Sequence, residues 1–164
     1  MEFARQVPAC IHREHLETLA LLERIEAALA KGKAAPAPGD AGWSRLLREF
    51  DANLANEIGR HFGFEEQELF PLLADGGDGD IAALLADEHA AILALAKRMI
   101  PALRAFAARG AAGDWPALRE MALELIERQV AHIQKEEMSL LPVLEDVLDA
   151  ERDRALLDRY LAAA

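Results

Sequence analysis

Four histidines interrupt apolar stripes that have helical spacing: His15, His61, His89 and His132. Two of them are followed four residues later by a glutamate, which gives the pairs His61–Glu65 and His132–Glu136. A step of four residues turns only about 40° around a helix, so each glutamate shares a face with its histidine. Imidazole and carboxylate groups without a thiolate are ligands that suit iron, manganese or zinc.

The glutamates decide between a structural and a metal-binding interpretation. A histidine on an apolar face is commonly a core residue with a backbone or side-chain partner. An unpaired carboxylate in a core is costly, however, and two of them among four histidines need several protons or several cations. A pair of metal ions satisfies all the groups at once. We therefore predict a metal site made of His15, His61, Glu65, His89, His132 and Glu136.

These candidates belong to an internal repeat of helical hairpins. The stripe that runs from Leu47 through His61 to Leu72 recurs 71 positions later, with His132 in the same place. The pairs Glu14-His15 and Glu88-His89 match in the other two segments. In antiparallel helices that rise about 1.5 Å per residue, the distances of the four histidines from the intervening breaks bring all the imidazoles to nearly one level.

Three stretches break the helical pattern, at residues 33–42, 75–80 and 109–114. They leave amphipathic segments near 7–32, 43–74, 81–108 and 115–147, and a short fifth helix is expected after Asp149. We predict an all-α fold, an antiparallel up-down-up-down four-helix bundle. It forms a single domain over residues 1–164, with a core at 7–147 and a short helical tail at 149–163; this tail covers the end of the bundle or makes a dimer contact.

Local signals refine these boundaries. Asp80 and Asp114 are placed to cap the third and fourth helices. Three prolines inside or at the ends of helices predict kinks or terminations: Pro71, Pro101 and Pro142. Tyr160, the only tyrosine, falls in the C-terminal tail, so we expect no tyrosine in the core for radical chemistry.

Composition bounds the classes of partner. The chain of 164 residues has a formal net charge of −11, which argues against nucleic acid and anionic membranes. The single cysteine, Cys10, excludes an internal disulfide and a cysteine-based metal site and favours a reducing compartment. Neither a membrane-spanning run nor a signal-peptide pattern is found, so a cytoplasmic location is expected.

The residues resemble the hemerythrin-like (HHE) cation-binding family over nearly all of positions 9–145. The resemblance is carried by His61-x3-Glu65-Glu66 followed by Phe70-Pro71, by the same run from His132 to Pro142, and by the two Glu-His pairs. It implies a four-helix bundle around a non-haem di-iron centre. His15 and His61 would bind one iron, His89 and His132 the other, and Glu65 and Glu136 would bridge them. The remaining positions would hold an oxide, a hydroxide or an exogenous ligand.

The sequence departs from the oxygen-carrying hemerythrins in two places. In the third helix, the oxygen-carrying hemerythrins have a second histidine four residues after the first. This sequence has Leu93 at that distance from His89. Their last carboxylate would fall on Glu137, but helix geometry favours Glu136, because five residues turn about 140° off the face. The pattern is closer to relatives with four histidines and two glutamates, which are associated with nitric oxide or oxygen response, iron handling and iron–sulfur repair.

Several polar residues remain as secondary candidates. His12, Glu66 and Glu137 could be further ligands, although a solvated or pairing role is favoured for each. Gln129 stands one turn before His132; it could bond a metal-bound ligand or mark local exposure, and exposure is preferred.

The expected function is that of a non-haem di-iron protein that binds or reacts with oxygen, nitric oxide or peroxide. Iron storage or donation without catalysis, and a structural zinc bundle, are the alternatives, with manganese as another possible metal. A homodimer or a redox protein is a possible partner.

Overall fold

The computed structural model describes residues 3–37, 39–56, 60–109 and 115–162, and these are helical almost throughout, with no strand among them. The first hairpin runs through α1 (Gln6–Ala30), α2 (Ala41–Asn56), α3 (Phe62–Phe64), the π-helical η2 (Glu65–Leu69), and α4 (Phe70–Leu73). The π-helical η3 (Ala74–Asp78) leads into the second hairpin, which contains α5 (Gly79–Arg109), α6 (Trp115–Met138) and α7 (Leu140–Val147). The last helix is α8 (Ala150–Ala162).

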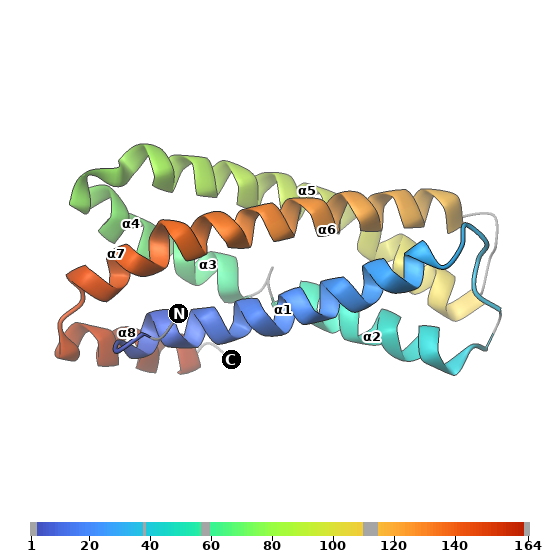
Figure 1. Ribbon diagram of the computed structural model, residues 1–164, viewed down its shortest axis with the longest axis horizontal. Coiled ribbons are helices and arrows are strands. Elements are labelled where there is room, and N and C mark those ends of the chain that lie inside the picture. Colours follow the sequence, from blue (N-terminus) through green and yellow to red (C-terminus); the bar gives the residue numbers. More distant parts are fainter. Residues whose placement is uncertain (1–2, 38, 57–59, 110–114, 163–164) are drawn as a thin grey trace.

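The long helices pack in chain order around a ring. Helix α1 contacts α2 and α6, and α5 contacts the same two helices (Figure 1). This arrangement confirms the predicted all-α, up-down-up-down bundle. Among the described residues, no helix is both long and apolar enough to cross a bilayer.

The turn between the hairpins is where the sequence predicted a break. Gly77 has a φ of 104°, a left-handed conformation that favours glycine. Asp80 was expected to cap the following helix, but α5 already begins at Gly79, so Asp80 lies in its first turn. An acidic residue in the first turn is favourable there, because the N-terminus is the positive end of the helix dipole. Asp114, the other expected cap, lies outside the described residues.

The three prolines behave differently. Pro71 lies in the first turn of α4, and Pro142 lies near the start of α7, just after Ser139, whose φ of −122° interrupts the helix. A proline is tolerated at such starts because the first N–H groups of a helix have no partner within it. At Pro101 a kink or a termination was expected; the helix does not end there, since α5 continues to Arg109.

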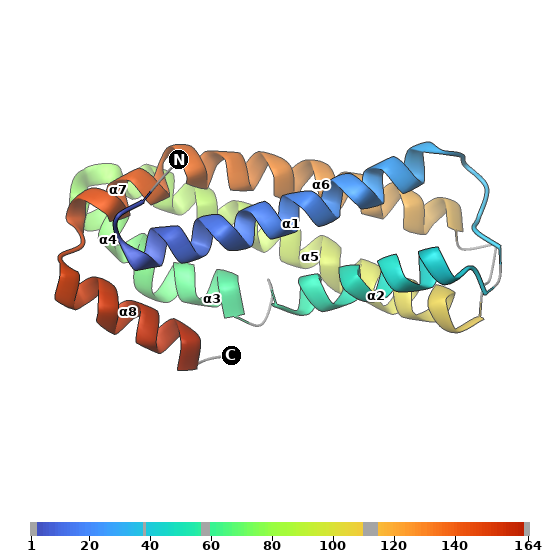
Figure 2. The same ribbon diagram turned by 60° about the horizontal axis from the view of Figure 1, so that its bottom comes forward.

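Helix α8 begins as expected after Asp149, whose Oδ1 accepts a hydrogen bond from the Arg152 N–H at 2.8 Å. It folds back along α1 at the end of the bundle that holds α4 and α7 (Figure 2). The buried carboxylate of Asp153 accepts the N–H groups of Gln6 and Val7, both at 2.8 Å. Helix α8 therefore caps the first turn of α1.

The apolar core consists of two clusters with a polar layer between them. One cluster includes Leu22, Phe50, Ile92, Met99 and Leu125, and the other includes Ile11, Leu69, Leu85 and Leu140. Along α1, His15 separates Ile11 from Leu22, and along α5, His89 separates Leu85 from Ile92. The histidines thus lie in a layer from which the clusters exclude water.

Candidate metal centre

The structure brings the six principal candidates together in the layer between the two clusters. All are buried: His15, His61, Glu65, His89, His132 and Glu136. They form two groups, and within each group the potential ligand atoms all lie within 4.8 Å of one another. One group has His15 and His61, the other has His89 and His132, and both glutamates belong to each group.

Each glutamate directs one carboxylate oxygen toward the pair His15 and His61 and the other toward the pair His89 and His132. Glu65 Oε1 lies 3.1 Å from His61 Nε2, and Oε2 lies 3.4 Å from His89 Nε2. Glu136 Oε1 lies 3.1 Å from His132 Nε2, and Oε2 lies 3.2 Å from His15 Nε2. The two carboxylates therefore span the two groups, as bridging ligands would.

These short contacts lack hydrogen-bond geometry. Both oxygens of Glu65, both oxygens of Glu136, and His15 Nε2 are buried without a hydrogen-bond partner. These atoms therefore lie close together while their hydrogen-bonding capacity stays unsatisfied. His89 Nε2 and His132 Nε2 also face each other at 2.9 Å, which requires a proton or a cation between two acceptor nitrogens. Buried polar atoms left in this way are rare, and this donor set fits metal ions.

Four more glutamates orient the imidazole rings from outside. The Nδ1–H of His15 faces Glu137 at 2.7 Å, and that of His89 faces Glu66 at 2.9 Å. Correspondingly, His61 Nδ1 lies 3.1 Å from Glu14, and His132 Nδ1 lies 3.1 Å from Glu88. Such contacts place the proton on Nδ1, direct Nε2 inward and raise its basicity.

Sequence reasoning missed the roles of Glu14 and Glu88. Their signal was the Glu-His pair in the first and third segments, but each glutamate serves a histidine of a neighbouring helix rather than the one beside it. The secondary candidates Glu66 and Glu137 belong to the same outer set, since they contact Nδ1 atoms. His12 extends this set, because its Nδ1 lies 2.8 Å from the second oxygen of Glu137.

The buried glutamates and histidines of the cluster shift one another's pKa values. Burial acts to raise the pKa of Glu136, but the imidazoles of His132, His15 and His89 close to its carboxylate outweigh burial and hold that pKa well below its usual range. Burial acts to lower the pKa of His15, but Glu136 and Glu137 raise it to about 9. The pKa of His89 is likewise raised to about 9, against burial, by Glu136 and Glu65. The metal-free cluster therefore holds protons that a metal ion must displace.

Comparison with known families identifies this arrangement. The chain matches Hemerythrin, the hemerythrin HHE cation binding domain, over residues 8–144. The chain belongs to the hemerythrin HHE cation-binding family. No curated protein matches it. All six principal candidates lie inside the matched range of the HHE domain, whereas α8 lies beyond it.

Tyr160 corrects one expectation about this HHE protein. It was assigned to a tail away from the core, but it is 1% exposed, and its hydroxyl donates to Glu14 Oε2 at 2.5 Å. The hydroxyl oxygen of Tyr160 also lies 3.3 Å from His61 Nδ1. The cause is the return of α8 along α1, which no local pattern predicts.

Gln129 corrects another expectation, because it is 1% exposed rather than solvent-facing. It continues the stripe that α6 packs inward, and this position fixes its burial whatever its polarity. Its Oε1 has no hydrogen-bond partner. Phe62 lines the centre of the HHE domain directly, since its ring stacks on His89 with centroids 3.7 Å apart.

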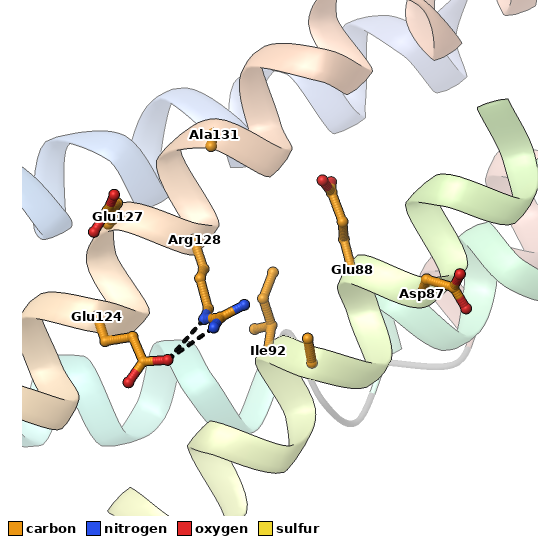
Figure 3. A pocket seen from close by; sticks show the side chains of 8 residues that line it. Asp87, Glu88, Ile92, Glu124, Glu127, Arg128 and Ala131 are labelled. Atoms are coloured by element: carbon orange, nitrogen blue, oxygen red, sulfur yellow. Dashed lines mark hydrogen bonds and ion pairs between the residues drawn. The ribbon is translucent and has the colours of Figure 1, made fainter.

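A surface groove of about 460 Å³ reaches the outer shell of the HHE site between α5 and α6 (Figure 3). Its lining consists of Asp87, Glu88, Ala91, Ile92, Glu124, Glu127, Arg128 and Ala131. Arg128 pairs with Glu124 on its own helix, while Glu88 extends from α5 toward α6. The groove meets the site at Glu88, the outer partner of His132, and is not itself lined by the six candidates.

Proposed function

We propose that this hemerythrin-family protein holds two iron ions. His15 and His61 bind one ion, His89 and His132 bind the other, and Glu65 and Glu136 lie between them. The observation that carries this assignment is the placement of the two oxygens of each glutamate, one close to each histidine pair.

The bound iron would supply redox chemistry for a small species such as oxygen, nitric oxide or peroxide. The chain's own residues fix the Nε2 atoms inward through four outer glutamates, and the clusters on either side exclude water. The Phe62 ring stacks on His89 and forms an apolar wall on one side of the pair His89 and His132. A small uncharged molecule is the kind of ligand that such a buried layer admits.

Metal analysis with an optical spectrum tests this proposal. Protein expressed in iron-supplemented medium and purified without a chelator is expected to contain two irons per chain and to change its spectrum with oxygen, nitric oxide or peroxide. His61→Ala and His132→Ala should each lower the iron content. Leu54→Ala, which truncates a buried residue of α2 away from the ligands, is the matched control and should keep both irons.

Other outcomes would select the alternatives. Two irons that exchange with chelators, without any reaction with the three small species, would indicate iron storage or donation. Stoichiometric zinc in a colourless protein, even after iron-rich expression, would indicate a structural site and end the redox proposal.

A further inference from the structure

The two halves of the repeat hold their outer glutamates with different partners. Glu88, which orients His132, accepts a hydrogen bond from Lys135 Nζ at 2.7 Å and lies on the open groove. Glu14, which orients His61, accepts from Arg60 at 2.8 Å and from the Tyr160 hydroxyl at 2.5 Å. The Glu88 carboxylate is thus held by a 43% exposed lysine, and the Glu14 carboxylate by an arginine and a buried phenol.

The phenol is itself held in place. Its ring packs against Phe64, with centroids 4.5 Å apart, and the Arg60 guanidinium lies 4.3 Å from the ring centroid. Helix α8, which carries it, is fixed to α1 by the buried Asp153 carboxylate. The Tyr160 hydroxyl therefore reaches Glu14 from a rigid support, 146 residues away in the sequence.

We propose that Tyr160 is a positioning residue of the metal centre, through which α8 makes the His15/His61 position the tighter and slower-releasing of the two. The hydroxyl fixes the Glu14 carboxylate, and Glu14 fixes the His61 ring with Nε2 toward Glu65. A ligand that is already oriented loses less freedom when a metal ion binds. This inference rests on the proposed two-metal function.

Titration with Co²⁺ alone, followed by its visible absorption, measures both positions without any reaction. The wild-type protein is expected to bind two ions per chain. Tyr160→Phe keeps the ring and removes the hydroxyl, and it should weaken the tighter of the two positions by about 10-fold. This is the lower end of the usual effect of losing a residue that orients a metal ligand, because Arg60 still donates to Glu14. Release of that ion into a chelator should accelerate, while the other position stays unchanged.

The matched control is Arg159→Ala in the same helix. Arg159 donates to Glu68 in η2 at 3.1 Å in a largely exposed pair, so its loss removes a surface contact of α8 and leaves the Tyr160–Glu14 and Asp153 contacts in place. We expect wild-type affinities at both positions. Equal weakening by Arg159→Ala and Tyr160→Phe would overturn the inference, because general loosening of α8 would then explain both effects.

A double variant tests the route through Glu14. If Tyr160 acts only through Glu14, Glu14→Gln combined with Tyr160→Phe should bind Co²⁺ no more weakly than Glu14→Gln alone. Additive losses would overturn the inference, and so would a Tyr160→Phe variant that titrates like the wild type. Failure of the wild type to bind two ions would instead refute the proposed function.

Discussion

The two hairpins of this protein carry the same inner residues at the same spacing but enclose them differently. In the second hairpin, His132 and Glu136 lie on one uninterrupted helix, α6. In the first, Glu65 begins the π-helical η2, which follows the three residues of α3. Despite this irregularity, both histidine Nε2 atoms lie 3.1 Å from the glutamate four residues on. Local spacing is therefore sufficient to reproduce the inner contact.

The outer environments differ because they depend on other parts of the chain. Glu14 lies beneath α8, and its side chain is 16% exposed, whereas the side chain of Glu88 is 25% exposed and borders the groove. A repeat thus duplicates the contacts made within a helix, while single elements such as α8 make its halves unequal.

The largest effect is expected from removing Glu136, which the two halves share. Glu136→Ala should abolish tight Co²⁺ binding at both positions, because Glu136 contributes an oxygen to each group. His132→Ala is the comparison, since it should weaken mainly one position. Isothermal titration with Co²⁺ measures both. One site of wild-type affinity surviving in Glu136→Ala would contradict the bridging assignment.

The pH dependence of stability should be alike in the two halves, because each has a histidine with a pKa raised to about 9: His15 and His89. The pKa of each histidine is about 6.5 in the unfolded chain, so its protonation stabilises the folded, metal-free protein fully below about pH 6.5. This contribution is lost as the pH rises toward 9. The Tm of the metal-free protein should therefore fall between pH 6 and pH 9.

Bound Co²⁺ replaces these protons, so it should raise the Tm more at pH 9 than at pH 6. Thermal melts with and without Co²⁺, at constant ionic strength, make the comparison. An increase in Tm that is the same at both pH values would contradict the proton displacement.

Lys135→Ala tests the weaker outer contact. Its ion pair with Glu88 is partly exposed, and such pairs contribute at most about 1 kcal/mol, or about fivefold in affinity. We expect a smaller loss of Co²⁺ affinity than in Tyr160→Phe, measured in the same titration. A larger loss would reverse the proposed order of the two halves.

The smallest effect is expected at Gln129, which stands where the first hairpin has Ile58 in the sequence. Gln129→Ile removes a buried oxygen without a hydrogen-bond partner, so the free energy of unfolding should rise by up to about 1 kcal/mol. Denaturant unfolding measures this change. Loss of Co²⁺ binding in the variant would show instead that Gln129 takes part in the site.

The sequence by itself determined the bundle, the repeat and the common level of the four histidines. It also favoured Glu136 over Glu137 as the inward residue, and Glu136 is fully buried while Glu137 turns to His15 Nδ1. These features follow from the rise and turn of a helix, which act over a few residues and are visible in spacing.

Only the tertiary structure decided the outer shell. Glu14 serves His61 rather than its neighbour His15, and Tyr160 reaches Glu14 across 146 residues. Both contacts depend on which helix faces which and on the return of α8 along α1. No periodicity in the sequence encodes such a pairing, because it arises only when distant helices pack against one another.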